Sequence, residues 1–269
     1  MRLRSQLSLD LIHDTPPLTL EDVVRLKHST RMLLADRVKE DLVAAVRGAS
    51  PQTPMREAIE VLERWDNTTG VESRGAVLFD AWFEAYLALT PNARSNAERW
   101  DRAFAEPWTA ARPVETPRGL ADPERAVTAF GVAVRETVAR YGSVDVPWGD
   151  VHRIRHGGLD VPVGGCEGGL GCFRTLGFRR AEDGTEVVYR GDGWIFAVEF
   201  GEVPRAYSVL AYGESSRDDS PHHTDQVQMF ADGRLKPVAF TDEQIEAQLI
   251  RRYRPGREAG GGSGEGGGR

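Results

Sequence analysis

The stretch Pro147-Trp-Gly-Asp-Val-His-Arg-Ile-Arg-His156 decides the fold class, because the spacing of apolar residues changes there. Before it, up to about residue 111, glycines are few and apolar residues recur every three or four positions, which is typical of helices. After it, short apolar runs are separated by turn residues, as in a chain of strands. The sequence therefore predicts an α+β protein, with a helical N-terminal half followed by antiparallel strands.

Capping and breaking residues bound the predicted helices of the first half. Thr19 with Asp22 three residues later is typical of a helix start, and Val23, Val24 and Leu26 are then expected on the buried face. Gly142 is expected to end the last helix of this half. The predicted helices cover residues 3–12, 19–26, 31–46, 54–65, 72–89 and 122–141.

The strongest helical pattern lies in residues 72–89. Leu78, Trp82 and Tyr86 follow one line along the helix, and Phe79 and Phe83 follow the next. A helix face with this many aromatic residues is expected to be buried. We interpret it as core packing, and the alternative is one wall of a hydrophobic ligand site.

The second half contains a predicted hairpin and two further strands. Residues 173–180 and 186–190 flank Glu182-Asp-Gly-Thr185, whose Asp-Gly step is typical of a hairpin turn. Residues 194–200 and 206–212 are predicted strands, and Thr241 with Gln244 starts a last helix. We expect a helical segment at 1–112, a mixed helix and strand segment of the same domain at 113–253, and a disordered glycine-rich tail at 254–269.

Charge and hydrophobicity exclude several classes of partner. The chain has 34 Lys and Arg against 41 Asp and Glu, a net charge of -7 and a pI near 5.5, so we expect no nucleic acid partner. No apolar stretch is long enough for a membrane helix, and Met1-Arg-Leu-Arg-Ser-Gln6 lacks the apolar run of a signal peptide. We therefore expect no membrane partner.

Ser220-Pro-His-His-Thr-Asp225 places a hydroxyl, two imidazoles and a carboxylate within six residues. These groups make up a Ser-His-Asp relay. However, neighbouring side chains of a loop rarely point at one another, and the Gly-x-Ser-x-Gly elbow is lacking. The alternative is a loop in which His and Asp side chains fix the backbone by hydrogen bonds.

His152 and His156, four residues apart, could bind zinc together with His222 or His223 and Asp225. That spacing suits a metal only on a helix. On a strand, alternation places both histidines and Ile154 on one face, with Val151, Arg153 and Arg155 on the other. We favour the strand and predict no metal and no cofactor.

The glycine-rich stretch Gly164-Gly-Cys-Glu-Gly-Gly-Leu-Gly171 brings backbone amides close together. It lacks the Lys-Ser or Lys-Thr ending of a phosphate loop, so we interpret it as a tight turn that needs positive backbone angles. Anion binding is the alternative. Cys166 and Cys172 are the only cysteines, and the residues leave open whether they form a disulfide or two buried thiols.

Nine segments, taken together and in order, carry a resemblance to a known family. They are Arg4-Ser-Gln-Leu-Ser-Leu-Asp-Leu-Ile12, Leu18-Thr-Leu-Glu-Asp22, Leu26-Lys-His-Ser-Thr-Arg-Met-Leu-Leu-Ala-Asp-Arg37, Trp148-Gly-Asp-Val-His-Arg153, Val163-Gly-Gly-Cys166, Leu170-Gly-Cys172, Gly191-Asp-Gly-Trp194, Ala211-Tyr-Gly-Glu-Ser-Ser216 and Ser220-Pro-His-His-Thr-Asp-Gln226. Over residues 2–253 the chain resembles the C-terminal part of the β subunit of the penicillin acylase family. These N-terminal nucleophile hydrolases include penicillin, cephalosporin and acyl-homoserine lactone acylases.

The resemblance implies an αββα sandwich, to which this chain contributes a part, and hydrolysis of a linear amide. In the family a Ser at the first position of the β chain attacks the carbonyl, and its own α-amine acts as base through a water. An Asn holds the oxyanion, and an Arg orients that Asn. Arg4 matches this Arg by its distance from Leu11-Ile12 and Thr19, and the alternative is that Arg4 merely ends a solvated helix face.

Met1 and Arg2 carry no hydroxyl or thiol, so we expect the nucleophile, its supporting His and the oxyanion Asn upstream of Met1. The expected partners are the N-terminal part of the acylase, meaning the α chain and the start of the β chain, and an acylated small molecule. The chain alone is expected to be inactive. The resemblance also implies a periplasmic or extracellular location and, with export, a Cys166–Cys172 disulfide. Two rival hypotheses are a stand-alone binding or scaffold protein, and a metal hydrolase using His152, His156 and His222.

Overall fold

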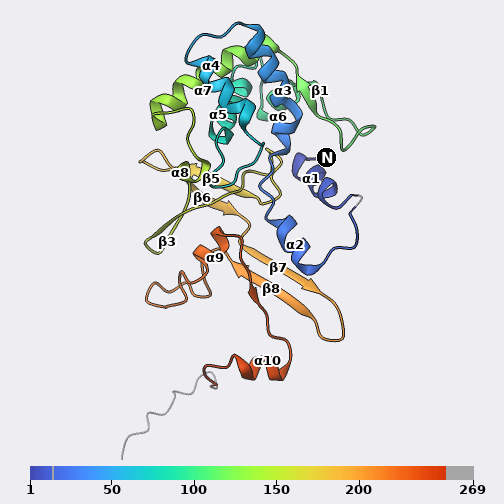
Figure 1. Ribbon diagram of the computed structural model, residues 1–269, viewed down its shortest axis with the longest axis vertical. Coiled ribbons are helices and arrows are strands. Elements are labelled where there is room, and N and C mark those ends of the chain that lie inside the picture. Colours follow the sequence, from blue (N-terminus) through green and yellow to red (C-terminus); the bar gives the residue numbers. More distant parts are fainter. Residues whose placement is uncertain (14, 253–269) are drawn as a thin grey trace, which may run out of the picture.

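The structure is a computed structural model that describes residues 1–13 and 15–252. Figure 1 shows a helical body at one end, a four-stranded sheet next to it, and a smaller sheet farther from that body. The helices are α1 (Leu3–Ile12), α2 (Leu20–Lys27), α3 (Leu33–Gly48), α4 (Met55–Arg64), α5 (Ala76–Ala88), α6 (Asn96–Asp101), α7 (Pro123–Tyr141), α8 (Trp148–Val151), α9 (Val227–Ala231) and α10 (Asp242–Ala247). The predicted tail at 254–269 lies outside the described residues.

Local capping accounts for where several helices begin and end. The Thr19 hydroxyl accepts a hydrogen bond from the Asp22 amide at 3.1 Å, and the Asp22 carboxylate accepts one from the Thr19 amide at 3.1 Å. Thr241 and Gln244 form the same reciprocal pair at the start of α10. Gly142 ends α7 in the left-handed conformation, with φ of 78°. The predictions made at these positions are confirmed.

Helix α5 is the centre of the helical body. Its aromatic residues Phe79, Trp82 and Tyr86 are fully buried, and Trp82 Nε1 donates a hydrogen bond to the Ala126 carbonyl of α7 at 3.1 Å. The core-packing interpretation is therefore confirmed. The predicted start at residue 72 is wrong, because the chain turns at Gly75 with φ of 112°. A Cβ there would lie 2.7 Å from that of Trp65.

The prediction that one face of α2 is buried is wrong in part. Leu20 is buried, whereas Val23 is 43% exposed and Val24 and Leu26 are only half-buried. Periodicity identifies the apolar face of a helix but not whether another element covers it. Here that face borders an open apolar groove against Trp194 and Phe196.

The strands are β1 (Phe104–Glu106), β2 (Arg118–Leu120), β3 (His152–His156), β4 (Leu159–Pro162), β5 (Leu176–Arg180), β6 (Glu186–Gly191), β7 (Trp194–Glu199), β8 (Arg205–Leu210) and β9 (Lys236–Pro237). The larger sheet has the order β4-β3-β6-β5. The predicted hairpin is present, with Arg180 opposite Glu186, and most pairings are antiparallel. Strands β3 and β6 pair in parallel, because they come from two separate hairpins and no turn sets their relative direction.

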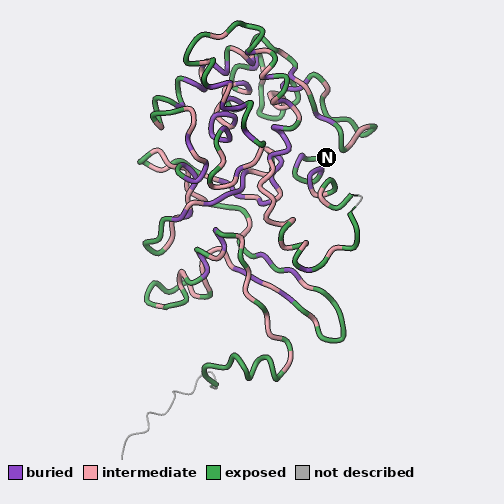
Figure 2. The backbone as a smooth tube through the Cα atoms, viewed as in Figure 1, coloured by how far each residue is buried: buried purple, intermediate pink, exposed green. Residues whose placement is uncertain are grey.

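The smaller sheet, β7-β8-β9, packs on a second apolar core that includes Ile154, Val209 and Phe230. Figure 2 shows burial concentrated in the helical body, while the far end of the β7–β8 pair is exposed. The short β1–β2 pair spans the boundary expected near residue 112, and the division into segments stays a prediction. Within the described residues, no helix is long and apolar enough to cross a membrane.

Candidate functional site

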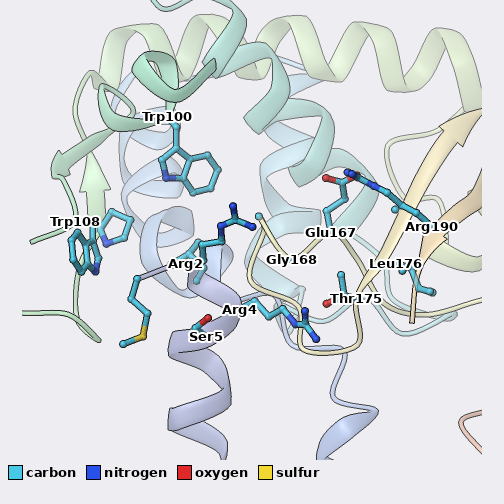
Figure 3. Close-up of a pocket in the computed structure, with 16 residues that line it drawn as sticks. Arg2, Arg4, Ser5, Trp100, Trp108, Glu167, Gly168, Thr175, Leu176 and Arg190 are labelled. Atoms are coloured by element: carbon cyan, nitrogen blue, oxygen red, sulfur yellow. The ribbon is translucent and has the colours of Figure 1, made fainter. Parts of the chain in front are cut away.

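The start of α1 forms one side of an open cleft of about 730 Å³, called here the Arg4 cleft. Figure 3 shows two tryptophans on one side of it and the glycine-rich loop on the other. Its lining includes Arg2, Arg4, Ser5, Trp100, Trp108, Glu167, Gly168, Thr175 and Arg190. Two of the three arginines, Arg2 and Arg4, have no carboxylate partner among the described residues, so the cleft carries unneutralised positive charge.

Arg4 is held by its stem while its guanidinium remains available. The Arg4 Cδ lies 3.2 Å from where a Cβ on Gly168 would stand, so the loop packs directly on this side chain. The guanidinium carbon is 5.9 Å from the centre of the Phe173 ring. Within residues 1–13 and 15–252, no carboxylate or carbonyl accepts a hydrogen bond from it. Its five N–H donors are therefore open to an acceptor from outside the described residues.

A half-buried ion pair fixes the aromatic ring against which Arg4 lies. Lys27 Nζ donates hydrogen bonds to Asp192 Oδ2 at 2.5 Å and to the Phe173 carbonyl at 3.1 Å. Asp192 Oδ2 also accepts a hydrogen bond from the Thr175 amide at 3.1 Å. Burial lowers the pKa of Lys27, against the opposing effect of Asp192. The pair joins α2 to the loop and holds Phe173 in place.

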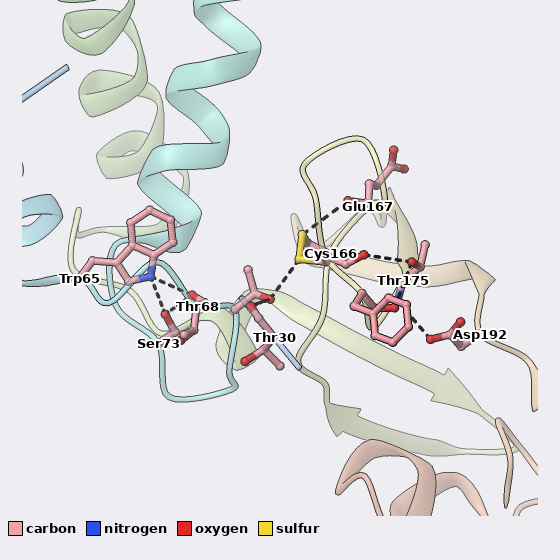
Figure 4. The surroundings of a disulfide bond; sticks show 11 residues. Thr30, Trp65, Thr68, Ser73, Cys166, Glu167, Thr175 and Asp192 are labelled. Atoms are coloured by element: carbon pink, nitrogen blue, oxygen red, sulfur yellow. Dashed lines mark hydrogen bonds between the residues drawn. A yellow bond between two sulfur atoms is a disulfide. The ribbon is translucent and has the colours of Figure 1, made fainter. Parts of the chain in front are cut away.

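The glycine-rich loop is closed by a disulfide between Cys166 and Cys172, whose Cα atoms are 5.4 Å apart (Figure 4). This bond resolves the alternative that the residues alone leave open. Gly165 and Gly171 have φ of +117° and +96°, and a Cβ on either would clash with neighbouring atoms. The tight-turn interpretation is confirmed at these two positions. Glu167, at the tip of the loop, pairs with Arg190 at 2.8 Å.

The family model described as penicillin amidase matches residues 2–247. The chain belongs to this family. It is 30% identical to an acyl-homoserine lactone acylase, PvdQ, of Pseudomonas fluorescens, over 92% of this chain and 32% of that protein. It is 27% identical to aculeacin-A acylase of Actinoplanes utahensis, over 94% of this chain and 33% of that protein. The chain thus spans about a third of the length of these relatives.

A solved structure, the thermostable penicillin G acylase from Alcaligenes faecalis, shares the fold. The TM-score is 0.50 at 15% sequence identity, with 94% of this chain and 53% of that chain covered. The helices and sheets described above therefore form part of an N-terminal nucleophile hydrolase fold. The predicted fold class and family resemblance are confirmed.

The loop that contains His222 does not assemble a Ser-His-Asp relay. His222 Nδ1 lies 2.9 Å from Asp225 Oδ2, but the Ser220 hydroxyl accepts a hydrogen bond from the His222 amide at 3.2 Å. His223 Nδ1 lies 3.2 Å from the Ser215 carbonyl. These side chains fix the loop backbone, as the alternative interpretation expects.

His152 and His156, which the metal hypothesis uses as ligands, pack against aromatic rings. His152 is 4% exposed and stacks on Trp148 with ring centres 3.4 Å apart, and burial lowers its pKa to about 3. His156 stacks on Tyr212 at 4.1 Å. Among the described residues, no group of three or more His, Cys, Asp or Glu side chains could hold a metal ion. The strand prediction for residues 152–156 is confirmed.

Sequence reasoning missed the supporting residues of the Arg4 cleft. Lys27 and Asp192 are 165 positions apart, and no local pattern indicates that they pair. A weak signal exists, since Lys27 ends an apolar helix face and Asp192 lies between two glycines, where a carboxylate often bonds to the backbone. Neither feature alone identifies a partner.

Proposed function

We propose that this chain is the C-terminal portion of an acylase that hydrolyses a linear amide of the penicillin, cephalosporin or acyl-homoserine lactone type. The family is one of amide-hydrolysing acylases, and the named relatives are about three times as long as this chain. In this proposal the N-terminal part, comprising the α chain and the start of the β chain, binds beside α1. It supplies the nucleophile, the supporting His and the oxyanion Asn.

The observation that carries the proposal is the unpartnered guanidinium of Arg4 in the cleft. A planar guanidinium offers N–H donors in a fixed geometry, which suits it to hold an amide oxygen in one orientation. Phe173 and Gly168 restrict the side chain from two sides, and Phe173 is itself held by Lys27. Arg4 is therefore assigned as the positioning residue for an oxyanion Asn that comes from the N-terminal part.

The groups already in the cleft do not supply a nucleophile with its own base. Ser5 is the hydroxyl residue nearest the start of the chain, but its amide nitrogen donates a hydrogen bond to the Arg2 carbonyl at 3.0 Å inside α1. A peptide nitrogen of this kind cannot act as the base that a free α-amine provides. The proposal accordingly places the nucleophile outside residues 1–269.

The test is to compare residues 1–269 alone with the same chain produced together with the sequence encoded upstream. Both are assayed on phenylacetyl, glutaryl and long-chain acyl amides. We expect turnover only from the extended protein, because nucleophile, base and oxyanion site must be held together. Robust turnover by the lone chain that is abolished by His222→Ala or Ser220→Ala would overturn the proposal.

The role of Arg4 is tested in the extended protein with Arg4→Ala, Arg4→Lys and a control, Arg56→Ala, on an exposed surface of α4. Loss of an oxyanion donor typically lowers kcat about 10²- to 10³-fold, and a misplaced Asn should cost a similar factor. We expect this loss in kcat with KM nearly unchanged for Arg4→Ala, and little rescue by Lys, which lacks the planar fork. An unchanged kcat in Arg4→Ala would contradict the assignment.

A further inference from the structure

A second cavity, of about 530 Å³, lies between α5 and the larger sheet and is called here the Asp80 cavity. It borders the Arg4 cleft, with which it shares Trp100, Glu167 and Gly169. Its volume lies in the range of small-molecule sites. The proposed role of Arg4 does not involve Asp80 or His152, which line this cavity. A function of the cavity is therefore considered separately.

Aromatic side chains form one wall of the Asp80 cavity. The rings of Trp148 and His152 stack almost in parallel, with an interplanar angle of 4°. The Phe178 ring meets His152 edge-on, with ring centres 4.6 Å apart. Trp148 and His152 are both almost completely buried, which makes this wall rigid. A stacked aromatic wall suits a flat apolar group or a cation.

Two polar atoms on this wall have no partner among the described residues. His152 Nδ1 lies 3.1 Å from the Trp148 carbonyl and donates to it, so the lone pair of the neutral ring is on Nε2. Burial keeps the pKa of His152 near 3, and Nε2 therefore remains an acceptor at neutral pH. Trp148 Nε1 is buried without an acceptor. His152 Nε2 is thus an acceptor on the wall of the cavity without a donor, and a donor group inside the cavity could bond to it.

The floor of the cavity carries the carboxyl group of Asp80. This carboxyl makes no hydrogen bond or ion pair within the described part of the chain. Burial, followed by the charges of Glu84, Glu186 and Glu167, raises the pKa of Asp80 to about 8, and Arg180 opposes this shift. Arg180 does not neutralise the floor, because it is already paired with Glu186 at 2.7 Å.

The other charged or titratable groups that line the cavity do not remove this negative field. Arg140 lies 3.7 Å from Glu136, and Tyr141 Oη donates a hydrogen bond to the Gly184 carbonyl at 3.4 Å. Arg179 is the remaining cation of the lining. The groups that face the cavity are Asp80, Glu84, Arg140, Tyr141, His152, Glu167, Arg179, Arg180 and Glu186. Of the four carboxyl groups in this lining, Glu186 is paired with Arg180 and Glu167 with Arg190. Asp80 and Glu84 therefore face a single guanidinium without a carboxylate partner, that of Arg179.

We propose that the Asp80 cavity binds an organic ammonium ion that carries an apolar body. The ammonium group would donate hydrogen bonds to the Asp80 carboxylate and to His152 Nε2, and the body would lie against Trp148 and Phe178. Binding releases the proton of Asp80 to solvent, so that a carboxylate faces the cation. This inference does not depend on the proposed acylase function.

The test is titration calorimetry of residues 1–269 with benzylammonium as probe. Benzyl alcohol is the neutral comparison and phenylacetate the anionic one. We expect benzylammonium to bind at least about tenfold more tightly than either at pH 8.5, because only the cation is attracted by the carboxylates. Asp80→Asn, which keeps the shape of the side chain, should remove this advantage. The control Glu57→Gln changes an exposed carboxylate on α4 and should leave it unchanged.

The pH dependence provides a second readout that a merely structural Asp80 would not give. Below its pKa near 8 the carboxyl is protonated, so affinity for benzylammonium should fall about tenfold for each unit of pH from 8 to 6. In Asp80→Asn the affinity should not vary over this range. Equal binding of benzylammonium and benzyl alcohol, tighter binding of phenylacetate, or full affinity in Asp80→Asn would each overturn the proposal. None of these results bears on Arg4 or on catalysis.

Discussion

The helical body and the β7–β8 pair differ in how far their aromatic residues are exposed to solvent. In the body, Phe79, Trp82 and Tyr86 are 0% exposed, because α5 is surrounded by other elements of the same chain. On the β7–β8 pair, Trp194 is 64% exposed and Phe200 85% exposed. The first region is completed by its own chain, whereas the second leaves large apolar surfaces in contact with water. This contrast supports the proposal that the chain is one portion of a larger acylase.

The largest effect should come from removing an aromatic core residue of α5. Trp82→Ala deletes a fully buried side chain and its hydrogen bond to Ala126, and such changes typically cost about 3–5 kcal/mol. Trp194→Ala deletes an exposed ring and one hydrogen bond to Ser208, so we expect a loss below about 1 kcal/mol. Urea unfolding of both variants measures the difference. Equal losses would break the contrast between the two regions.

Local signals made the helix ends and the hairpin predictable from the sequence. Thr19 with Asp22, and Thr241 with Gln244, form their hydrogen bonds within four residues, and the Asp-Gly turn joins β5 and β6 directly. The start of α5 could not be predicted in this way. Gly75 turns there because Trp65, ten positions earlier, occupies the space that a side chain would need.

The candidate site depends even more on distant contacts. Only the family resemblance points to Arg4, since one arginine near the start of a helix has no distinguishing pattern of its own. The pairing of Lys27 with Asp192 is set by tertiary structure, and so is the approach of Glu167 and Glu186 to Asp80, whereas Glu84 is one turn from Asp80 on the same helix. A sequence shows which residues can ionise, but it does not show which ones share a cavity.

The junction between the two regions should be the next most sensitive point. Arg174 is 4% exposed, and its Nη2 donates hydrogen bonds to the carbonyls of Phe230 at 2.5 Å and Ala231 at 3.1 Å. These carbonyls end α9, which packs on the smaller sheet. The Phe230 carbonyl also accepts a hydrogen bond from the Gly233 amide at 3.1 Å, so Arg174→Met leaves only the Ala231 carbonyl without a donor, and we expect a loss of about 2 kcal/mol. Urea unfolding gives the size, and hydrogen exchange should place the loss in α9. Unchanged exchange there would contradict this role.

The disulfide should contribute a similar amount. Cys166→Ser together with Cys172→Ser opens a short loop, and the chain-entropy estimate for a loop of this size is about 2 kcal/mol. The thermal midpoint of the variant, compared with that of the wild-type chain, measures the loss. A reducing agent should lower the midpoint of the wild-type chain and leave the variant unchanged. If the reducing agent has no effect on either protein, the bond is not formed in solution.

The smallest effect on stability, and the sharpest test of the contrast, should come from the exposed end of the β7–β8 pair. Phe200 is 85% exposed, so Phe200→Ser removes almost no buried contact, and the free energy of unfolding should change by less than about 0.5 kcal/mol. Self-association should change far more, because exposed aromatic residues beside a strand edge promote contact between molecules. Strand β7 pairs only with β8 among the described residues, so its other edge is open.

Sedimentation velocity over a range of concentrations should show less association for Phe200→Ser than for the wild-type chain. Tyr189→Ser is the control, since Tyr189 is 47% exposed but lies on β6, which has a partner on each side. If Tyr189→Ser reduces association as much as Phe200→Ser does, general surface hydrophobicity explains the self-association, and the exposed end of the β7–β8 pair is not its cause.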